Sequence, residues 1–151
     1  MNIRRFLADK FQLYWLALNY WLDGDDWCLR DILEDDPQIE IPDYVASRLN
    51  GAYRDRPIIS DPERDELAPT CVAHYAKDLS TRLVRDGRFP HGVRPYTVRE
   101  YGRLQGVPDT FVFAGSDRDA YRMIGNGVSV PVGQWIAEEA CRYFGAQRMA
   151  A

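Results

Sequence analysis

Two stretches near the end of the chain decide the fold: RPYTVREYGRLQGVPDTFVF at residues 94–113 and YRMIGNGVSVPVGQWIAEEA at residues 121–140. In the first stretch, Thr97 and Glu100 have the spacing of a capping box. The threonine hydroxyl of such a box accepts from the Glu100 amide while the Glu100 carboxylate reaches back to the threonine amide. Gly106 then ends the helix. The helix presents one buried face, which consists of Val98, Tyr101 and Leu104/Gln105.

The second stretch predicts a glycine-containing loop followed by an amphipathic helix. Residues 125–128 (Gly-Asn-Gly-Val) form the loop, and the helix runs from about Val130 to Phe144. Ser129 and Pro131 suit its first turn. Apolar residues recur along it at the i, i+3 and i+4 spacing of one helix face. These residues are Val132, Trp135, Ile136, Ala140, Tyr143 and Phe144.

Together the two stretches resemble consecutive motifs of the DNA (cytosine-5) methyltransferases. Residues 94–113 resemble motif IX and residues 121–140 resemble motif X, in the family's order and separation. The resemblance implies that Asn126, Gly127 and Val128 line a pocket for S-adenosylmethionine. The family usually has alanine or serine at the position of Gly127, and often proline at the position of Ser129.

The catalytic motifs of that family do not occur in this sequence. Such an enzyme needs a glycine-rich cofactor loop, a nucleophilic cysteine in a Pro-Cys-Gln turn, and a Glu-Asn-Val strand end that activates cytosine. None of the three cysteines, Cys28, Cys71 and Cys141, is flanked as Pro-Cys-Gln, and no G-x-G-x-x-G is present. We therefore expect no catalytic residue in this chain, and we expect it to use S-adenosylmethionine only in complex with a partner.

Composition restricts the class of protein further. At 151 residues, the chain has room for one domain or two small lobes, and a 46% apolar content supports a packed core. An odd number of scattered cysteines argues against a disulfide framework and favours a reducing, cytoplasmic location, associated with the nucleoid if the protein binds DNA. The apolar run at residues 11–22 is too short for a membrane span of about 20 residues, and no signal peptide is visible. We expect no metal site.

The formal net charge of −4 is unevenly distributed. Residues 23–43 carry nine carboxylates against Arg30 alone, whereas cationic side chains predominate in residues 77–103. The cationic residues of the second segment are Lys77, Arg82, Arg85, Arg88, Arg94, Arg99 and Arg103. That segment is suited to face phosphates and the first is not, although two ordinary solvated faces would also explain the pattern.

The region between these segments resembles the family's target-recognition part. Residues 27–36 (WCLRDILEDD) predict a short helix and resemble the segment that follows motif VIII. Residues 50–69 are rich in Arg, Asp, Pro and Gly and predict a loop. Residues 68–75 resemble the Pro-Thr-x-x-Ala-x-Tyr segment of the recognition domain, which implies that Thr70 and Tyr75 lie at the DNA face, with Thr70 on a phosphate.

A hairpin is predicted after this segment. Residues 82–85 and 88–89 flank Asp86-Gly87, and Asp-Gly supplies the positive φ that a tight type I′ turn needs. Arg82, Arg85 and Arg88 would project near the turn, and we infer from the hairpin that they contact double-stranded DNA. Arg99 has two possible partners, a neighbouring carboxylate or a phosphate, and we favour the structural role.

These expectations combine into an α+β fold with three parts. Residues 1–26 form an apolar segment that packs on the chain's own core or docks on a partner. Residues 27–93 form a small recognition lobe with short strands and a hairpin. Residues 94–151 form the motif IX and X region. The C-terminal helices would complete the α/β catalytic domain of a partner. The expected contact residues are Val132, Trp135, Ile136 and Tyr143.

Two functions remain open from the sequence. In the first, the chain is the non-catalytic subunit of a split, heterodimeric methyltransferase of a restriction-modification type, and its partner carries motifs I to VIII. In the second, the chain is an inactive relic that acts as a DNA-binding, regulatory or protein-interaction module. A true subunit should expose an apolar surface that a partner covers, whereas a relic should have covered it.

The absence of a nucleophile and of a glycine-rich cofactor loop gives a direct prediction. The purified chain should transfer no methyl group to duplex DNA and should bind no appreciable S-adenosylmethionine. Tritium incorporation from labelled S-adenosylmethionine and isothermal titration calorimetry measure the two properties. Methyl transfer by the chain alone that disappears in Cys71→Ser would contradict the prediction.

Overall fold

The computed structural model describes residues 28–149 except 53, 56 and 65, and their fold is α+β, as expected. Three short strands form one sheet in the order β1-β2-β3. β1 (Ile58–Ser60) pairs parallel with β2 (Arg82–Arg85), and β2 pairs antiparallel with β3 (Val93–Pro95). β1 lies inside the segment that the sequence predicted to be a loop. The prediction for residues 1–26 lies outside the described residues.

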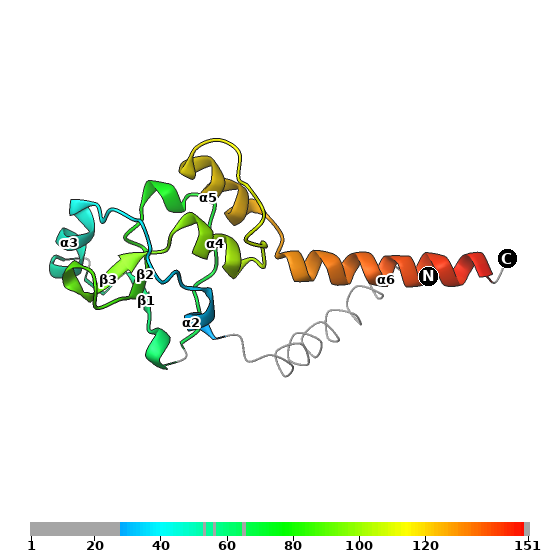
Figure 1. Ribbon diagram of the computed structural model, residues 1–151, viewed down its shortest axis with the longest axis horizontal. Helices are drawn as coiled ribbons and strands as arrows, with labels where there is room; N and C mark the ends of the chain where they lie inside the picture. The colour runs from blue at the N-terminus through cyan, green and yellow to red at the C-terminus, as the bar shows by residue number, and fades with distance from the viewer. Residues whose placement is uncertain (1–27, 53, 56, 65, 150–151) are drawn as a thin grey trace.

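Among the residues that the structure describes, five α-helices surround or extend from the sheet (Figure 1). They are α2 (Leu29–Ile32), α3 (Asp43–Asn50), α4 (Val98–Leu104), α5 (Asp117–Asn126) and α6 (Val130–Met149). Three 3-10 turns join them: η1 (Pro62–Arg64), η2 (Tyr75–Lys77) and η3 (Pro90–Gly92). Within the described part of the chain, no helix combines the length and the hydropathy that crossing a membrane requires.

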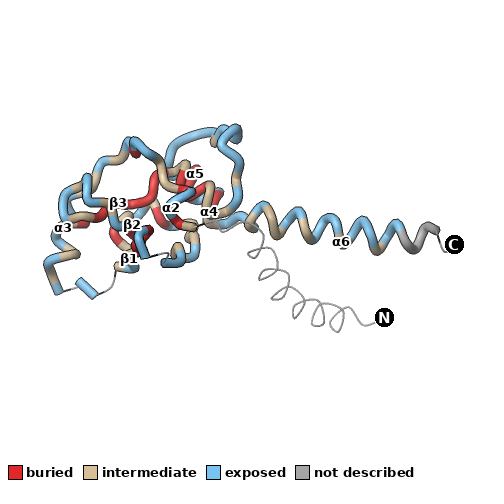
Figure 2. The backbone as a smooth tube through the Cα atoms, turned by 60° about the horizontal axis from the view of Figure 1, so that its bottom comes forward, coloured by how far each residue is buried: buried red, intermediate tan, exposed pale blue. Residues whose placement is uncertain are grey.

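The core consists of two clusters on opposite faces of β2. Leu83 packs with Val45 of α3 and Val93 of β3, whereas Val84 points into a larger cluster with α2, α4 and α5. Successive side chains of a strand point to opposite faces, so one short strand serves both clusters. Buried residues accordingly concentrate around the sheet and its covering helices (Figure 2).

Four of the eight buried residues of the larger cluster are tyrosines. The rings of Tyr75 and Tyr101 stack at 4.6 Å between centroids, and Tyr121 meets both edge-on at 5.2 and 5.4 Å. The Tyr75 hydroxyl donates to the Arg82 carbonyl at 2.6 Å and accepts from the Tyr96 amide at 3.0 Å. Buried tyrosines therefore both fill the core and satisfy backbone groups around it.

A fully buried ion pair connects the sheet to α4. Arg94 of β3 donates to both carboxylate oxygens of Glu100, at 2.7 and 2.8 Å, and neither side chain is exposed. Asp86 accepts from the Nε of Arg94 at 2.8 Å. Glu100 also accepts from the amides of Glu34 and Thr97, both at 2.9 Å. Each charge thus has an opposite charge or several hydrogen bonds, which a buried ion requires.

The predicted capping box of α4 is present. The Thr97 hydroxyl accepts from the Glu100 amide at 3.1 Å while the Glu100 carboxylate accepts from the Thr97 amide. At the other end, Gly106 adopts φ +73°, and Val107 and Gly106 donate to the carbonyls of Gly102 and Arg103. This is the Schellman pattern, so Gly106 ends the helix as predicted.

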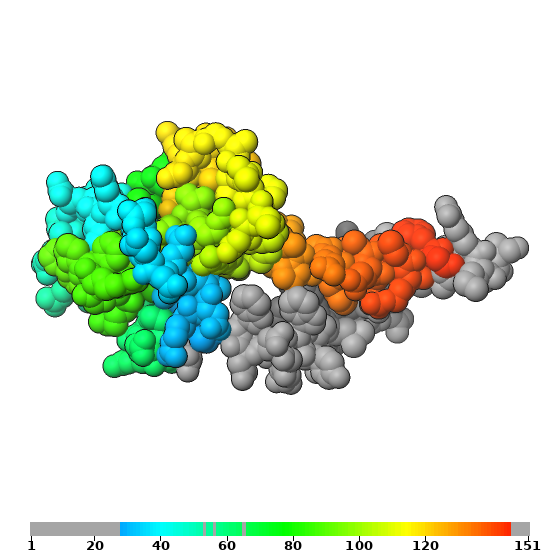
Figure 3. All heavy atoms as spheres, in the orientation of Figure 1, coloured from blue at the N-terminus to red at the C-terminus, as the bar shows by residue number. Residues whose placement is uncertain are grey.

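The start of α6 is joined to the end of α4. The Val130 amide donates to the Gln105 carbonyl at 2.8 Å, and a Cβ added at Gly106 would lie 2.5 Å from the Cδ of Pro131. From that contact α6 runs outward, away from the sheet and the other helices (Figures 1 and 3). Gly106 is therefore required twice, for its φ and for the close approach of α6.

Three expectations about local structure need correction. The helix expected over residues 27–36 is only α2, because Leu33 is already extended at ψ 148°. The hairpin expected at Asp86-Gly87 has a longer connection: β2 pairs with residues 93–95, and the Asp86 amide donates to the Gly92 carbonyl. Asp86 accepts from Arg88 and Arg94 and so stabilises a wide turn rather than a tight one.

The third correction concerns residues 125–128, of which only Gly127 and Val128 lie in the connection between α5 and α6. Gly125 and Asn126 are the last residues of α5, a helix that the Ser116–Asp119 capping box begins. A Cβ at Gly125 would lie 2.2 Å from the amide nitrogen of Ala73. Gly125 is therefore present to let α5 lie against the backbone of another segment, and it does not end the helix.

Removing one member of the buried pair should destabilise the fold strongly. Arg94→Met leaves the Glu100 carboxylate buried beside an apolar side chain, and we expect the free energy of unfolding in urea to fall by about 3–5 kcal/mol. Adding Glu100→Gln should restore part of the loss, because the amide is neutral and still accepts from the backbone. Arg122→Met, in an exposed pair with Asp119 at 3.0 Å, is the control and should cost about 1 kcal/mol or less. Equal losses for the two single variants would contradict this account.

Candidate functional site

Of the two predicted DNA-contacting residues, Thr70 lies at the surface and Tyr75 lies in the core. Thr70 is exposed, and its carbonyl accepts from the Nε of Arg82 at 2.9 Å. Tyr75 is 0% exposed, and burial raises the pKa of its hydroxyl well above the ordinary value. Tyr75 offers no surface to a ligand, so the predicted DNA contact does not fit its position. Its place in the tyrosine cluster gives it a structural role.

The three arginines around the expected hairpin each have a partner within the chain. Arg82 holds the Thr70 carbonyl, Arg85 pairs with Asp61 at 2.9 Å, and Arg88 pairs with Asp86 at 2.8 Å. Arg85 and Arg88 nevertheless remain more than half exposed, at 57% and 54% of their side chains. Hydrogen bonds from Arg88 and then Arg94 hold the pKa of Asp86 well below its usual range. The exposed guanidinium surface is accessible to an anion, but none of the three arginines lacks a partner.

Arg99 has the structural role that we favoured, with different partners. Its guanidinium donates to the carbonyl of Phe111 at 3.2 Å and lies 3.5 Å from that of Pro108. These carbonyls belong to the loop between α4 and α5, so Arg99 closes that loop onto its helix.

The residues that the resemblance assigns to a cofactor lie at the junction of α5 and α6. Asn126 ends α5, and Gly127 and Val128 follow it, all three exposed. The Gly127 amide already donates to the Met123 carbonyl at 2.9 Å. The Asn126 amide group and the exposed Val128 side chain, which is 67% accessible, are therefore the groups available to a ligand. They form an exposed edge at the α5–α6 junction.

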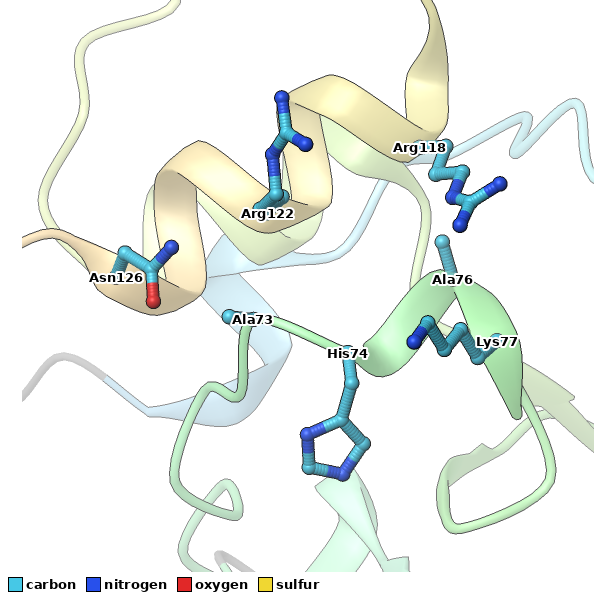
Figure 4. Close-up of a pocket in the computed structure, with 7 residues that line it drawn as sticks. All are labelled: Ala73, His74, Ala76, Lys77, Arg118, Arg122 and Asn126. Carbon is cyan, nitrogen blue, oxygen red and sulfur yellow. The ribbon is translucent and has the colours of Figure 1, made fainter.

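A cationic groove lies beside that edge, between residues 73–77 and α5 (Figure 4). Its volume is about 270 Å³. We call it the η2–α5 groove, and it is lined by Ala73, His74, Ala76, Lys77, Arg118, Arg122 and Asn126. Sequence analysis did not single out His74, Arg118 or Arg122. The signal was available, because Arg118 and Arg122 are four residues apart and share a face of α5 once its capping box is recognised.

The apolar residues expected at a partner interface lie along α6. Ile136 is 53% exposed and Phe144 is 62% exposed. Val132, Trp135 and Tyr143 are partly buried, and the Tyr143 ring meets Phe144 edge-on at 5.4 Å. Large apolar side chains therefore reach solvent along a helix that runs away from the sheet.

Cys71, which follows Pro69-Thr70, is not a reactive nucleophile. It lies half-buried against the Tyr101 carbonyl, and burial raises the pKa of its thiol to about 11. Since the thiolate is the nucleophile, an unreactive thiol at neutral pH is the consequence. Among the described residues, no cluster of three His, Cys, Asp or Glu side chains could hold a metal ion.

Comparison with known proteins identifies the family. The family described as C-5 cytosine-specific DNA methylase matches residues 38–142, which is more than half of the chain, and the chain belongs to this family. The type II methyltransferase M.NlaX of Neisseria lactamica is 45% identical over 71 residues, covering 46% of this chain and 22% of that protein. M.SsoII of Shigella sonnei is 41% identical over 78 residues, covering 51% of this chain and 20% of that protein.

The fold is similar to that of a solved methyltransferase. The crystal structure of the Dnmt2 methyltransferase of S. pombe matches with a TM-score of 0.64 and 18% sequence identity, covering 80% of this chain and 42% of that one. The chain thus spans about a fifth of the length of the bacterial relatives and less than half of the solved structure.

The raised pKa of Cys71 predicts slow alkylation. At pH 8 a thiol of pKa about 11 is about 0.1% thiolate, against about a quarter for an unperturbed cysteine of pKa about 8.5. Iodoacetamide should therefore modify Cys71 on the order of a hundredfold more slowly than the exposed Cys141. Peptide mass spectrometry over time measures both rates in one sample, and equal rates would contradict the assigned environment.

Proposed function

We propose that the chain is the non-catalytic subunit of a split DNA (cytosine-5) methyltransferase. It would supply target recognition and complete the S-adenosylmethionine domain of a partner that carries motifs I to VIII. The observation that carries the proposal is α6, a helix of family motif X that runs outward from the sheet with Ile136 and Phe144 more than half exposed. Exposed large apolar side chains in a row mark a surface that another chain covers.

The recognition role is supported by the surface around residues 70–88. Thr70 has an exposed side chain on a backbone that Arg82 holds in place, and a hydroxyl so positioned suits a phosphate oxygen. Arg85 and Arg88 present exposed guanidinium surface from the same β2–β3 region. Arginine and lysine contacts to phosphates give affinity that does not depend on sequence. Base-specific contacts would come from the complete enzyme, which extrudes its target cytosine from the duplex.

The cofactor role is supported by the edge at Asn126 and Val128. In the assembled enzyme these residues would hold S-adenosylmethionine from one side, and the partner's glycine-rich loop would hold it from the other. The cofactor supplies the methyl group, and this chain's part is to bind and enclose it. The exposed groups at the α5–α6 junction suit a site completed from outside.

Association with the catalytic partner should depend on the apolar face of α6. Ile136→Asp puts a charge into the proposed contact, and we expect the affinity for the partner to fall by at least about 30-fold, which corresponds to about 2 kcal/mol at an interface hot spot. The matched control is Gln134→Asp, which adds the same charge to an exposed polar position on the same helix. Pull-down from the native host with mass spectrometry identifies the partner, and calorimetry measures the affinity.

Two outcomes would overturn the split-enzyme proposal. One is a stable monomer that recovers no methyltransferase-like protein, which would favour the relic. The other is equal loss of affinity in both variants. Restored methyl transfer on mixing the two chains would support the proposal, provided that Ile136→Asp abolishes the transfer and Gln134→Asp does not.

A further inference from the structure

The η2–α5 groove has cationic side chains on both walls. Lys77 comes from η2, whereas Arg118 and Arg122 come from α5, one helical turn apart (Figure 4). His74 adds a ring nitrogen at the N-terminal end of η2. Ala73 and Ala76 are small, so they leave space between the two walls. Cationic residues from elements far apart in the sequence thus line this space, although in Figure 4 the Arg122 side chain extends away from residues 73–77 and the His74 ring extends away from α5.

Few carboxylates compensate this charge. Arg122 pairs with Asp119 at 3.0 Å. Asp78, the carboxylate next to Lys77, accepts from the Ser80 hydroxyl at 2.5 Å and pairs with Arg48 at 2.7 Å. Within the described part of the chain, neither Lys77 nor Arg118 has a carboxylate within 4 Å. Arg118 and Arg122 both act electrostatically on Asp119, but Lys77 and Arg118 form no ion pair within the described residues and are available to an external anion.

The two walls are held in a fixed relation. Gly125 brings α5 against the backbone of Val72 and Ala73, where a Cβ would lie 2.2 Å from backbone atoms. The Tyr101 hydroxyl accepts from the Val72 amide, which anchors the same segment to α4. The Tyr75 ring, just after His74, meets the Tyr121 ring of α5 edge-on at 5.2 Å. The groove is thus preformed, and an anion entering it orders only the exposed side chains.

The size of the groove indicates what it can hold. A volume of about 270 Å³ is below the range of about 300–1,000 Å³ that encloses drug-sized molecules. Several water molecules, at about 30 Å³ each in the liquid, or one phosphate group with its hydration would fill it. A cofactor as large as S-adenosylmethionine would not be enclosed. A small anion such as a single phosphate group fits these dimensions.

We propose that the η2–α5 groove binds a backbone phosphate of duplex DNA through Lys77, Arg118 and Arg122. The proposal rests on the proposed function, because it takes DNA as the polyanion. The contact positions the duplex and reads no base, since point charges on flexible side chains meet the phosphate alone. A chain with a formal net charge of −4 needs local cationic sites of this kind to approach DNA.

The first test is the salt dependence of DNA binding by the full chain. Fluorescence anisotropy with a labelled 20-base-pair duplex measures the slope of log K against log salt. The slope of the Lys77→Gln/Arg118→Gln variant should be shallower than that of the unmodified chain by about 0.9, because the variant loses one phosphate contact. At 0.1 M salt the loss of this contact should lower the affinity of the variant for the duplex about eightfold. The control is Arg30→Gln/Arg54→Gln, which removes the same charge from exposed arginines that do not line the groove. Equal slopes for the two double variants would overturn the proposal.

The second test uses the lysine content of the chain. Lys10 and Lys77 are its only lysines, so acetylation of Lys77 can be measured against Lys10 in the same sample. Saturating duplex, at a concentration where anisotropy shows full binding, should reduce the Lys77 acetylation rate at least about fivefold relative to Lys10, because a lysine paired with phosphate is a poor nucleophile. Unchanged Lys77 reactivity on fully bound DNA would overturn the groove assignment and leave the split-enzyme proposal intact.

Two further ligands, S-adenosylmethionine and polyglutamate, test whether the groove binds something other than a DNA phosphate. Protection by S-adenosylmethionine without DNA would make the groove part of the cofactor site, and protection by polyglutamate but not by duplex would make it a protein-binding surface. Either result would overturn the phosphate assignment. A full chain that binds no duplex at any salt concentration would overturn it as well, whereas recovery of a catalytic partner by pull-down tests the proposed function separately.

Discussion

The buried pair of Arg94 and Glu100 is the interaction on which the other elements depend. The two side chains are joined by two hydrogen bonds and are wholly excluded from solvent. Glu100 also binds the amides of Glu34, after α2, and Thr97, before α4. One carboxylate therefore connects the end of α2, strand β3 and the start of α4. Because a buried charge without partners is costly, each of these segments must reach its place before the pair is satisfied.

The same pair also helps to fix the path of the chain from the sheet to α6. α4 is held by Glu100 at its start, and its end is bound to the start of α6 through Gln105 and Gly106. Its middle carries Tyr101, whose hydroxyl bonds the Val72 backbone beside the η2–α5 groove. DNA-facing and partner-facing surfaces of the proposed enzyme are thus attached to one seven-residue helix. In the proposed enzyme, α4 would therefore hold both surfaces in place.

Sequence predicted best where local chemistry determines structure. The α4 capping box and its glycine end follow from Thr97, Glu100 and Gly106, and the structure confirms them.

The sequence-based prediction failed where contacts between residues far apart in the sequence determine the local structure. The Asp86-Gly87 pair suggested a tight turn, but Asp86 accepts from Arg88 and from Arg94, eight residues on, and the turn is wide. Gly125 suggested a loop, but it lies inside α5, against Ala73. Tyr75 suggested a surface contact, but three other tyrosines surround it in the core. No local pattern reports such long-range partners. The spacing of Arg118 and Arg122 places both on one face of α5, but the sequence did not show that Lys77 lies opposite them.

The attachment of α6 has a mechanical consequence. Twenty residues of α-helix extend about 30 Å, and the described contacts of this helix with the sheet-bearing part are at its first turn. A rotation of about 10° at that turn would displace the far end by about 5 Å, by the geometry of a rod of this length. Conversely, a partner bound at the far end of α6 would exert a torque on the contact between α6 and residues Gln105 and Gly106. That torque would act first on α4, which ends at this contact. A small movement of α4 would in turn produce a larger displacement at the far end of α6.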